Sequence, residues 1–354
     1  MKGYQATLFL CTTIFLLFWY VDAYEAGAEE TVRPPAEYGK IITQIDKDQA
    51  GLSETILFLG DVMLARDVES KMKTFGVDYP FSGTKEVMNS RYVVGNFESA
   101  MSEYHRQTAN GAMRFSTSVG SLAGLVNSRV THLSLANNHT FDYGQSGFDY
   151  TANQLELRNI DFFGHPYGLA TSSVSFFELE GLDVALIGIN STNGAIDESN
   201  LENVISYAGE NSNLQIAYVH WGDEYKNLSN TSQQKLAREL IDKGVDLVVG
   251  HHPHVVQEIE SYNDKLIFFS LGNFIFDQYF SEEVQTGLML RLGISTSKKS
   301  GYIDLLPATS LDSRAQPRLI LEEGKENFLY ELAGKSRVTD SGSIHNGVLT
   351  FSLD

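Results

Sequence analysis

The sequence contains almost no cysteine. Its only cysteine among 354 residues is Cys11, which lies inside an apolar N-terminal segment. An internal disulfide is therefore excluded. The rest of the chain has no thiol, so a cysteine nucleophile and a thiolate-ligated metal site are excluded as well. A metal site in this protein would have to use nitrogen and oxygen ligands.

Positive charge is also scarce. The chain has 26 Lys and Arg against 45 Asp and Glu, a formal net charge of −19, and no basic block of five or more residues. Nucleic-acid binding normally requires a basic stripe, so we expect no nucleic-acid partner, and docking on anionic lipid is disfavoured. With 42% apolar and 11% aromatic residues, the chain can still build a sizeable core and is not a disordered chain.

Two common catalytic motifs are missing. Gly334-Lys335-Ser336 resembles the end of a phosphate-binding P-loop, but Leu329 occupies the position of the first glycine and no strand precedes it. No Gly-x-Ser-x-Gly elbow surrounds any serine. The sequence therefore supports neither ATP hydrolysis by a P-loop nor a serine triad of the hydrolase type.

The N-terminus carries one long apolar run. Lys2 is followed by a mainly apolar stretch from about Ala6 to Val21, and Val21-Asp22-Ala23 is an acceptable cleavage site. This arrangement is typical of a secretory signal. We expect an exported protein, with residues 1–23 as a signal peptide or membrane anchor and residues 24–53 as a linker. The protein would then be anchored to the cell membrane, periplasmic or extracellular.

From Thr55 onward, short apolar runs alternate with segments of helical period. Strands that alternate with helices and are followed by hairpins predict a mixed α/β sandwich. We assign residues 54–295 to this domain and the more polar residues 296–354 to a C-terminal extension packed on it. The predicted strands are 56–59, 92–94, 132–135, 160–163, 173–179, 184–189, 216–219, 245–249, 266–271, 288–292 and 302–306, and the predicted helices are 121–127, 145–158, 232–243 and 326–332.

Polar clusters follow five of the predicted strands. In α/β sheets, ligands bind in the crevice outside the carboxyl ends of the strands. Imidazole, carboxylate and amide side chains gathered there are what a metal site with oxygen and nitrogen ligands needs. The clusters are Gly60-Asp61-Val62-Met63, Gly95-Asn96-Phe97-Glu98, Ala136-Asn137-Asn138-His139, His220-Trp221-Gly222-Asp223-Glu224 and Gly250-His251-His252-Pro253-His254.

The five clusters differ in how specifically they indicate a ligand site. The last is the most specific, because three imidazoles in four residues are costly to bury unpaired and useful as metal ligands. His252 and His254 alternate along the chain and could hold one ion together. Asp61 could instead cap a helix, the Asn-x-Glu of the second cluster could be a polar loop, and a single histidine such as His220 is often a core residue.

The third cluster predicts a catalytic histidine. Two amides and an imidazole directly after an apolar strand have no obvious packing purpose. Asn138 can supply an oxygen to a metal, which leaves His139 free to face the reacting group as a general acid. Asp142 follows three residues later and can hold the tautomer of His139 by a hydrogen bond. The alternative is that His139 only buttresses its loop.

Taken together and in this order, the clusters resemble the blocks of the bacterial CapA/PgsA family of capsule (poly-γ-glutamate) synthesis proteins. The resemblance covers about residues 55–295 and includes a sixth block, Ser270-Leu271-Gly272-Asn273-Phe274-Ile275-Phe276-Asp277-Gln278. The domain of that family is similar to metallophosphoesterases of the calcineurin type. The resemblance therefore implies a four-layer α-β-β-α sandwich with a site for two metal ions.

The more distant resemblance also implies roles for individual residues. Asp61 is similar to the metal aspartate of the first block, but Met63 stands where its partner histidine is expected. Glu98 or Asn96 stands where the bridging aspartate is expected. The implied metal ligands are Asp61, Glu98, Asn138, His220, His252 and His254, and the implied catalytic residues are His139 and Asp142. Five further polar side chains of the blocks are predicted to bind substrate, namely Asn96, Asn137, Glu224, His251 and Asn273.

The resemblance implies a function in capsule or poly-γ-glutamate biosynthesis. We expect an exported, metal-dependent hydrolase or transferase that holds one or two divalent ions, which could be Mn, Zn, Fe or Mg. Its partners would be an anionic polymer or a phosphorylated or γ-glutamyl substrate, together with membrane-bound capsule-synthesis proteins. Two other functions remain open, a non-catalytic factor for polymer assembly or export and a secreted metallophosphoesterase unrelated to capsule. Metal-dependent turnover of a phosphodiester or a γ-glutamyl peptide separates an enzyme from an assembly factor.

Overall fold

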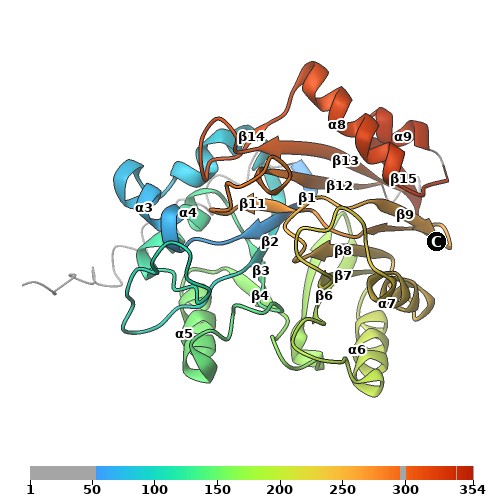
Figure 1. The fold of residues 1–354 in the computed structure, drawn as a ribbon. Coiled ribbons are helices and arrows are strands. Elements are labelled where there is room, and N and C mark those ends of the chain that lie inside the picture. The colour runs from blue at the N-terminus through green and yellow to red at the C-terminus, as the bar shows by residue number, and fades with distance from the viewer. Residues whose placement is uncertain (1–52, 296–299, 340, 354) are drawn as a thin grey trace, which may run out of the picture. The chain divides into compact units, whose positions relative to one another are not determined.

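The computed structural model contains two β-sheets packed face to face with helices around them (Figure 1). It describes residues 53–295, 300–339 and 341–353. The predicted signal peptide or anchor and the predicted linker, apart from Ser53, lie outside the described residues. Within the described ranges, no helix is long and apolar enough to cross a membrane.

The larger sheet has nine strands. Their order is β14-β13-β12-β1-β2-β3-β4, with β11 also beside β1 and β15 beside β13. Strands β1 to β4 run parallel to one another, whereas β12 is antiparallel to β1. The strands are β1 (Ser53–Val62), β2 (Ser90–Phe97), β3 (His132–Ser134), β4 (Asp161–Phe163), β11 (Asn273–Ile275), β12 (Thr286–Ser295), β13 (Ser300–Thr309), β14 (Arg318–Leu319) and β15 (Val348–Ser352).

The smaller sheet has six strands in the order β5-β6-β7-β8-β10-β9. Its four central strands, β6, β7, β8 and β10, are parallel, and the two edge strands are antiparallel to their neighbours. The strands are β5 (Val174–Leu179), β6 (Leu182–Asn190), β7 (Leu214–His220), β8 (Leu247–His251), β9 (Ile259–Tyr262) and β10 (Lys265–Phe268).

The helices cover the sheets from outside. Helices α6 and α7 bury their apolar sides against one face of the smaller sheet, and α3, α4 and α5 lie beside the larger sheet (Figure 1). The helices are α3 (Arg66–Phe75), α4 (Leu122–Asn127), α5 (Gly144–Glu156), α6 (Glu198–Glu210), α7 (Thr231–Asp242), α8 (Glu322–Lys335) and α9 (Ser341–His345), with 3-10 turns η2 (Tyr79–Val87), η3 (Val119–Ser121), η4 (Thr171–Ser173) and η5 (Glu283–Gln285).

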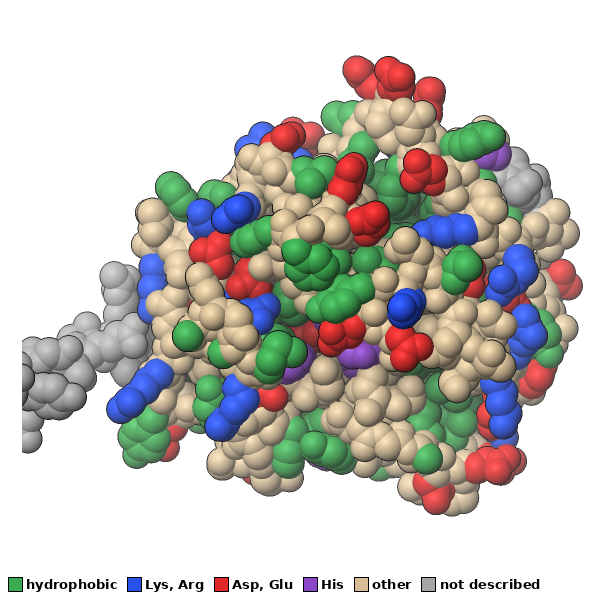
Figure 2. All heavy atoms as spheres, viewed as in Figure 1, with side chains coloured by type: hydrophobic (Ala, Val, Ile, Leu, Met, Phe, Trp, Pro, Cys, Tyr) green, Lys and Arg blue, Asp and Glu red, His purple; other side chains and the backbone are tan. Residues whose placement is uncertain are grey.

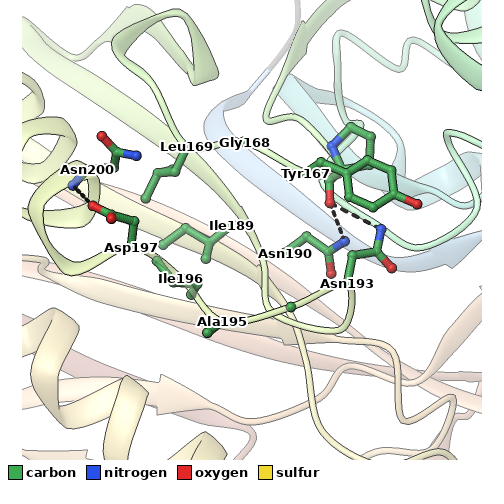
Figure 3. A pocket seen from close by; sticks show the side chains of 12 residues that line it. Tyr167, Gly168, Leu169, Ile189, Asn190, Asn193, Ala195, Ile196, Asp197 and Asn200 are labelled. Atoms are coloured by element: carbon green, nitrogen blue, oxygen red, sulfur yellow. Dashed lines mark hydrogen bonds between the residues drawn. The ribbon is translucent and has the colours of Figure 1, made fainter.

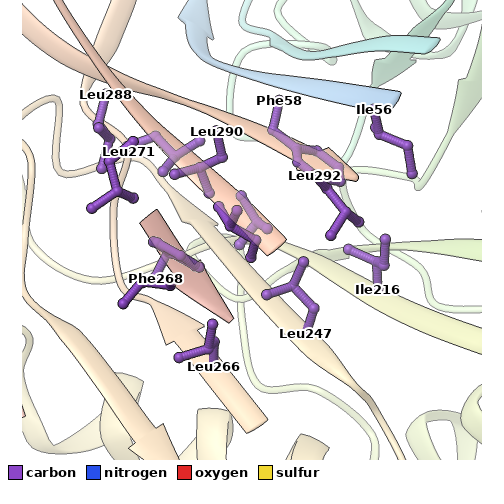
Figure 4. Close-up of a cluster of buried hydrophobic side chains, with 14 of the residues drawn as sticks. Ile56, Phe58, Ile216, Leu247, Leu266, Phe268, Leu271, Leu288, Leu290 and Leu292 are labelled. Atoms are coloured by element: carbon purple, nitrogen blue, oxygen red, sulfur yellow. The ribbon is translucent and has the colours of Figure 1, made fainter. Parts of the chain in front are cut away.

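The main apolar core lies between the two sheets. Alternate residues of β1, such as Ile56 and Phe58, meet Ile216 and Leu247 of the smaller sheet there (Figure 4). Burying one such side chain contributes about 1.5–3 kcal/mol. The Tyr218 hydroxyl also crosses the interface and donates a hydrogen bond of 2.8 Å to the carbonyl of Leu59. These contacts fix the two sheets against each other and so set the relative positions of their strand ends.

The fold class predicted from the sequence, an α/β sandwich, is confirmed. The predicted strand 266–271 is too long, because β10 ends at Phe268 and the chain then crosses to the larger sheet, where β11 pairs with β1. Helix α6 is absent from the predicted elements, although its buried side is apolar. Strand β13, from the part assigned to a C-terminal extension, pairs with β12 over ten register positions.

Candidate metal and active site

The predicted site residues meet where the carboxyl ends of parallel strands from both sheets face each other. Strands β1, β2 and β3 contribute from the larger sheet, and β7 and β8 contribute from the smaller one. Histidine side chains are visible at the bottom of a hollow in this face, with acidic and apolar side chains around them (Figure 2). The crevice therefore occupies the position that the topology of an α/β fold favours for ligands.

Two glycines allow neighbouring backbone segments to pass close to these strand ends. A Cβ on Gly60, just before Asp61, would lie 2.1 Å from the carbonyl oxygen of Gly272, and a Cβ on Gly250, just before His251, would lie 2.0 Å from that of Phe269. No side chain fits at either distance. The glycines that open the first and last clusters are therefore required because another backbone segment passes against the strand ends.

Three side chains, which we call the inner group, lie at the buried end of the crevice. They are Asp61, Glu98 and His220, whose ligand atoms all lie within 4.8 Å of one another. Asn96 Nδ2 approaches all three, at 2.9 Å from Asp61 Oδ1, 3.0 Å from Glu98 Oε1 and 3.1 Å from His220 Nδ1. An amide has only two hydrogens for these three acceptors. Asn96 is 1% exposed and lies behind the group.

The charge of Asp61 is stabilised by two imidazoles. Burial alone would raise the pKa of Asp61, but hydrogen bonds with His251 and His254 outweigh burial and hold this pKa well below its usual value. The distances are 3.2 Å from His251 Nδ1 to Oδ1 and 3.1 Å from His254 Nδ1 to Oδ2. His251 is buried, with its ring 4.1 Å from that of Tyr218, so it lies behind Asp61.

Glu98 is in the opposite electrostatic situation. Burial and, after it, the negative charge of Asp61 raise the pKa of Glu98 well above its usual value. Its Oε2 atom is buried without a hydrogen-bond partner among the described residues, and His254 Nε2 lies 3.9 Å from it. A positive charge between these side chains would offset the repulsion between Asp61 and Glu98 and would give Glu98 Oε2 a partner.

A second set of side chains, the outer group, lies beside the inner group. It comprises Glu224, His252 and His254, whose ligand atoms also lie within 4.8 Å of one another. Glu224 is half-buried, and His252 is 8% exposed with a buried Nδ1 that has no partner among the described residues. Burial and the neighbouring His254 lower the pKa of His252 to about 4, which keeps the imidazole neutral, the form that binds metals.

The residues present fit a divalent cation. The two groups offer imidazole nitrogens and carboxylate oxygens, the donors that suit Mn, Fe or Zn. Buried polar groups are normally paired, yet Glu98 Oε2, His251 Nε2 and His252 Nδ1 have no partner within the described part of the chain. Asn138 Oδ1 lies 2.9 Å from His220 Nε2, which places the predicted amide ligand next to the inner group.

His139 and Asp142 form a pair beside the metal groups. His139 Nδ1 lies 3.1 Å from Asp142 Oδ2, and the same oxygen accepts a 2.6 Å hydrogen bond from the backbone N–H of Phe115. The ring of Phe115 stacks on that of His139, with centroids 3.9 Å apart and planes at 25°. These contacts fix the imidazole and leave its Nε2 as the atom available for a substrate.

Two of the predicted substrate ligands are engaged in holding loops. Asn137 is fully buried, and its Oδ1 accepts hydrogen bonds from the backbone N–H groups of His139 and Thr140. Asn273 Oδ1 lies 3.0 Å from His254 Nδ1, and its Nδ2 donates to the carbonyl of Val284. Both amides therefore position histidines of the site.

A cavity of about 540 Å³ opens next to the outer group and is lined by His139, Glu224, Tyr225 and His254. Its wall also contains Arg66, which sequence analysis did not identify. The Arg66 guanidinium lies 4.4 Å from the centroid of the Phe115 ring and forms an ion pair with Asp277.

Sequence signals for this pair existed, because Arg66 follows the first cluster by three residues and Asp277 lies inside the sixth block. The charge of Arg66 is balanced by Asp277, so the pair ties the start of α3 to the segment after β11.

A smaller hollow of about 130 Å³ lies apart from these groups, between the end of β6 and the start of α6 (Figure 3). Two of its amides are occupied within the protein, because Asn190 Nδ2 and Asn193 Nδ2 both donate to the carbonyl of Pro166. Asp197 accepts from the backbone N–H of Asn200 and caps α6. This hollow is explained by loop and helix-end structure.

The fold and the site define a two-sheet α/β sandwich with histidines, carboxylates and amides gathered at its strand ends. Residues 55–278 match a family described as bacterial capsule synthesis protein PGA_cap, and the chain belongs to this family. The PGA biosynthesis protein CapA of Bacillus subtilis (strain 168) is 31% identical over 322 residues, which cover 84% of this chain and 82% of that protein. The capsule biosynthesis protein CapA of Bacillus anthracis is 31% identical over 257 residues, covering 66% and 62%.

Two solved structures are similar at low identity. One is a hypothetical protein from Thermus thermophilus, with a TM-score of 0.44, 16% identity, and coverage of 74% of this chain and 95% of that one. The other is described as a novel phosphatase from Mycoplasma pneumoniae, with a TM-score of 0.43, 13% identity, and coverage of 75% and 90%.

Proposed function

We propose that this protein is an exported enzyme of capsular polymer biosynthesis that acts on a phosphorylated or γ-glutamyl substrate with the help of a divalent metal ion. The observation that carries the proposal is the buried convergence of Asp61, Glu98, His220 and His254, with polar atoms left unpaired, at the strand ends of two sheets. Membership of the capsule synthesis family and the two CapA relatives support the process in which it takes part.

The residues that would hold one or two such ions are Asp61, Glu98, Asn138, His220, His252 and His254. When bound, a divalent ion polarises a phosphoryl or acyl oxygen and adds positive charge for an anionic substrate. The protein itself supplies orientation and exclusion of water, because Asn96 fixes the inner carboxylates and the crevice floor is fully buried.

His139 would deliver a proton to the leaving group. Asp142 accepts the hydrogen bond of its Nδ1–H, so the proton that the protonated ring can give away is the one on Nε2, at the wall of the cavity. The stack on Phe115 restricts rotation of the imidazole ring. A positioned general acid of this kind contributes about 100- to 10,000-fold in rate.

The test uses the purified full-length chain and two substrates, bis-p-nitrophenyl phosphate and a γ-glutamyl anilide. Turnover of each is measured with Mn²⁺ and with a chelator. We expect Mn²⁺-dependent turnover of one of them and a loss of about 100- to 10,000-fold in His139→Ala, with bound metal unchanged. Near-full activity in His139→Gln would mean that His139 only buttresses its loop. Loss of metal in His139→Ala would refute its assignment to the substrate, and metal binding without any turnover would favour an assembly factor.

Export is a separate part of the proposal and is supported by the sequence alone. Lys2 and the apolar run to Val21 have the character of a secretory signal. An enzyme reporter that is active only in the cytoplasm, fused after Asp48, should be silent, whereas the same reporter fused to a chain that begins at Ser53 should be active. Strong activity of the first fusion would contradict export.

A further inference from the structure

We infer that Arg314 is a specificity-determining residue of the large cavity, where its guanidinium binds a free carboxylate of the substrate apart from the group that reacts. The inference deepens the proposed function and rests on it for the place where the substrate reacts. It favours a γ-glutamyl substrate, which carries such a carboxylate, over a phosphorylated one. Arg314 lies in the loop between β13 and β14, in the part of the chain that the sequence assigned to a C-terminal extension.

The two arginines of the cavity wall differ in their partners. Arg66 is 6% exposed and forms an ion pair with Asp277. Arg314 is exposed and forms no ion pair with an acid in the described part of the chain. Its side chain also donates no hydrogen bond to another described residue, so all five N–H donors of its guanidinium are available to a ligand.

An aromatic ring supports the guanidinium of Arg314. The Cζ atom lies 4.8 Å from the centroid of the Tyr279 ring, which also lines the cavity. The Tyr279 hydroxyl in turn donates a 3.0 Å hydrogen bond to Asp67 Oδ2. A guanidinium that rests on a ring face keeps its N–H edges free, and its planar fork matches the two oxygens of a carboxylate. The stack therefore orients Arg314 without using the groups that would bind a ligand.

The loop that carries Arg314 is fixed to η2. The Tyr79 hydroxyl donates a 3.2 Å hydrogen bond to the carbonyl of Arg314. Gln316 Nε2 donates to the carbonyl of Tyr79 at 2.9 Å and to Ser82 Oγ at 2.8 Å. Between them, Ala315 is fully buried with a φ of 60°. Since the loop is ordered before a ligand arrives, binding has less conformational entropy to lose there.

The charges of the wall favour a ligand group with one negative charge. Besides the two arginines, the wall contains the carboxylates of Asp67, Glu224 and Asp277, and the whole chain has a net charge of −19. Guanidinium groups bind both carboxylates and phosphates in a bidentate manner. A terminal phosphate carries about two negative charges at neutral pH, which these carboxylates would repel. One unpaired guanidinium in such surroundings matches a carboxylate better.

The test is binding of tri-γ-glutamate to the full-length chain, measured by isothermal titration calorimetry with the same free Mn²⁺ concentration in both solutions. We expect Arg314→Gln to weaken binding about tenfold, because it removes hydrogen bonds between charged groups. The control is Arg318→Gln, which removes the same charge from a nearby side chain that donates to Gln316 Oε1 and does not line the cavity. This variant should bind as the wild type does.

Two further ligands separate a carboxylate from other groups. The same peptide with its α-carboxylates converted to carboxamides should bind the wild type about tenfold more weakly, and Arg314→Gln should weaken it no further. Inorganic tripolyphosphate should bind the wild type and Arg314→Gln equally. If Arg314→Gln instead weakens tripolyphosphate and leaves tri-γ-glutamate unchanged, the residue binds phosphate, and the assignment to a carboxylate is wrong.

The remaining outcomes separate this inference from the proposed function. Equal affinity of the wild type and Arg314→Gln for tri-γ-glutamate, or no binding by the wild type, refutes the inference whether or not the chain turns over a substrate. If Arg318→Gln weakens binding as much as Arg314→Gln, the effect is one of overall charge, and the assignment to Arg314 fails. If binding depends on Arg314 but no substrate is turned over, the catalytic part of the proposed function fails while the carboxylate-binding role of Arg314 stands. Circular dichroism of each variant confirms that the fold is retained.

Discussion

The inner and outer groups are built from the same kinds of side chain but in different ways. Asp61, Glu98 and His220 of the inner group are 0–1% exposed and joined through one amide, Asn96. The outer group faces the cavity, and its loops are joined by backbone hydrogen bonds such as that from Tyr225 to Pro253. The inner group is therefore part of the folded core, whereas the outer group opens to the cavity through Glu224 and is joined to the core through the contact of His254 with Asp61.

The two acids of the inner group sharpen the contrast. Asp61 has two imidazoles as partners, and its pKa is lowered, whereas Glu98 has Asp61 as its neighbour, and burial and that charge raise its pKa. One carboxylate is thus stabilised as an anion by the protein itself. The other lacks a positive partner on the side that faces His254 and the outer group. A cation bound where the two groups meet would therefore contribute most to the stability of the ionised carboxylates.

The largest expected effect is a difference in folding stability between a variant of the inner group and a variant of the outer group. Asp61→Ala removes a hydrogen-bond acceptor from two buried imidazoles, those of His251 and His254, and a buried donor left unpaired costs about 1–3 kcal/mol. Glu224→Ala truncates a half-buried carboxylate at the cavity wall and should change the free energy of unfolding by less than about 0.5 kcal/mol. Urea unfolding of both variants in the presence of a chelator measures this difference. Equal losses would show that the outer group is as much a part of the core as the inner one.

The sequence predicted which residues gather but not how they divide into groups. The alternation of strands and helices indicated which strand ends face one crevice, and so Asp61, His220 and His254 could be placed there. Their partners depend on contacts between segments far apart in the chain. Asn96 was predicted to bind substrate, but it lies buried behind Asp61, which is 35 residues away. No local pattern reports such a contact.

The elements that were missed have physical causes of two kinds. Helix α6 has a clear signal, since Leu201, Val204, Ile205 and Ala208 are buried at helical spacing. Strand β11 has only three residues, and its pairing with β1 depends on the chain crossing between the sheets. The first could have been read from periodicity, whereas the second follows only from the packing of the two sheets.

His132 is a buried imidazole outside both groups and shows what burial alone does to a histidine of this protein. His132 lies at the sheet interface against Tyr92 and Phe177, with ring centroids 5.6 and 4.9 Å away. Burial lowers the pKa of His132 from 6.5 to about 4. The carboxylate of Asp161, 3.5 Å away, is 71% exposed and therefore screened by solvent.

Because the pKa of His132 is lower in the folded state, its contribution to stability is complete above pH 6.5 and is lost as the pH falls toward 4. The difference of about 2.5 between the two pKa values corresponds to about 3 kcal/mol. Between pH 7.5 and 4.5, the free energy of unfolding of the wild type should therefore fall by about 2.5 kcal/mol more than that of His132→Phe. Urea unfolding in a chelator at both pH values measures this, and equal losses would mean that His132 is not kept neutral by burial.

The smallest expected effect concerns the amide beneath the inner group. Asn96→Ala removes the contact that orients Asp61, Glu98 and His220, and loss of such an orienting partner typically lowers metal affinity by about 10- to 100-fold. Asn96 reaches the outer group only through Asp61 and Glu98, which neighbour His254, so the affinity of the outer group should fall less than that of the inner group. Measured in the Glu224→Gln background, Mn²⁺ titration reports the inner group alone. In a chain with Glu224 intact, the same substitution should weaken one binding step more than the other. If both steps weaken equally, the two groups act as one site, and the division between them does not hold.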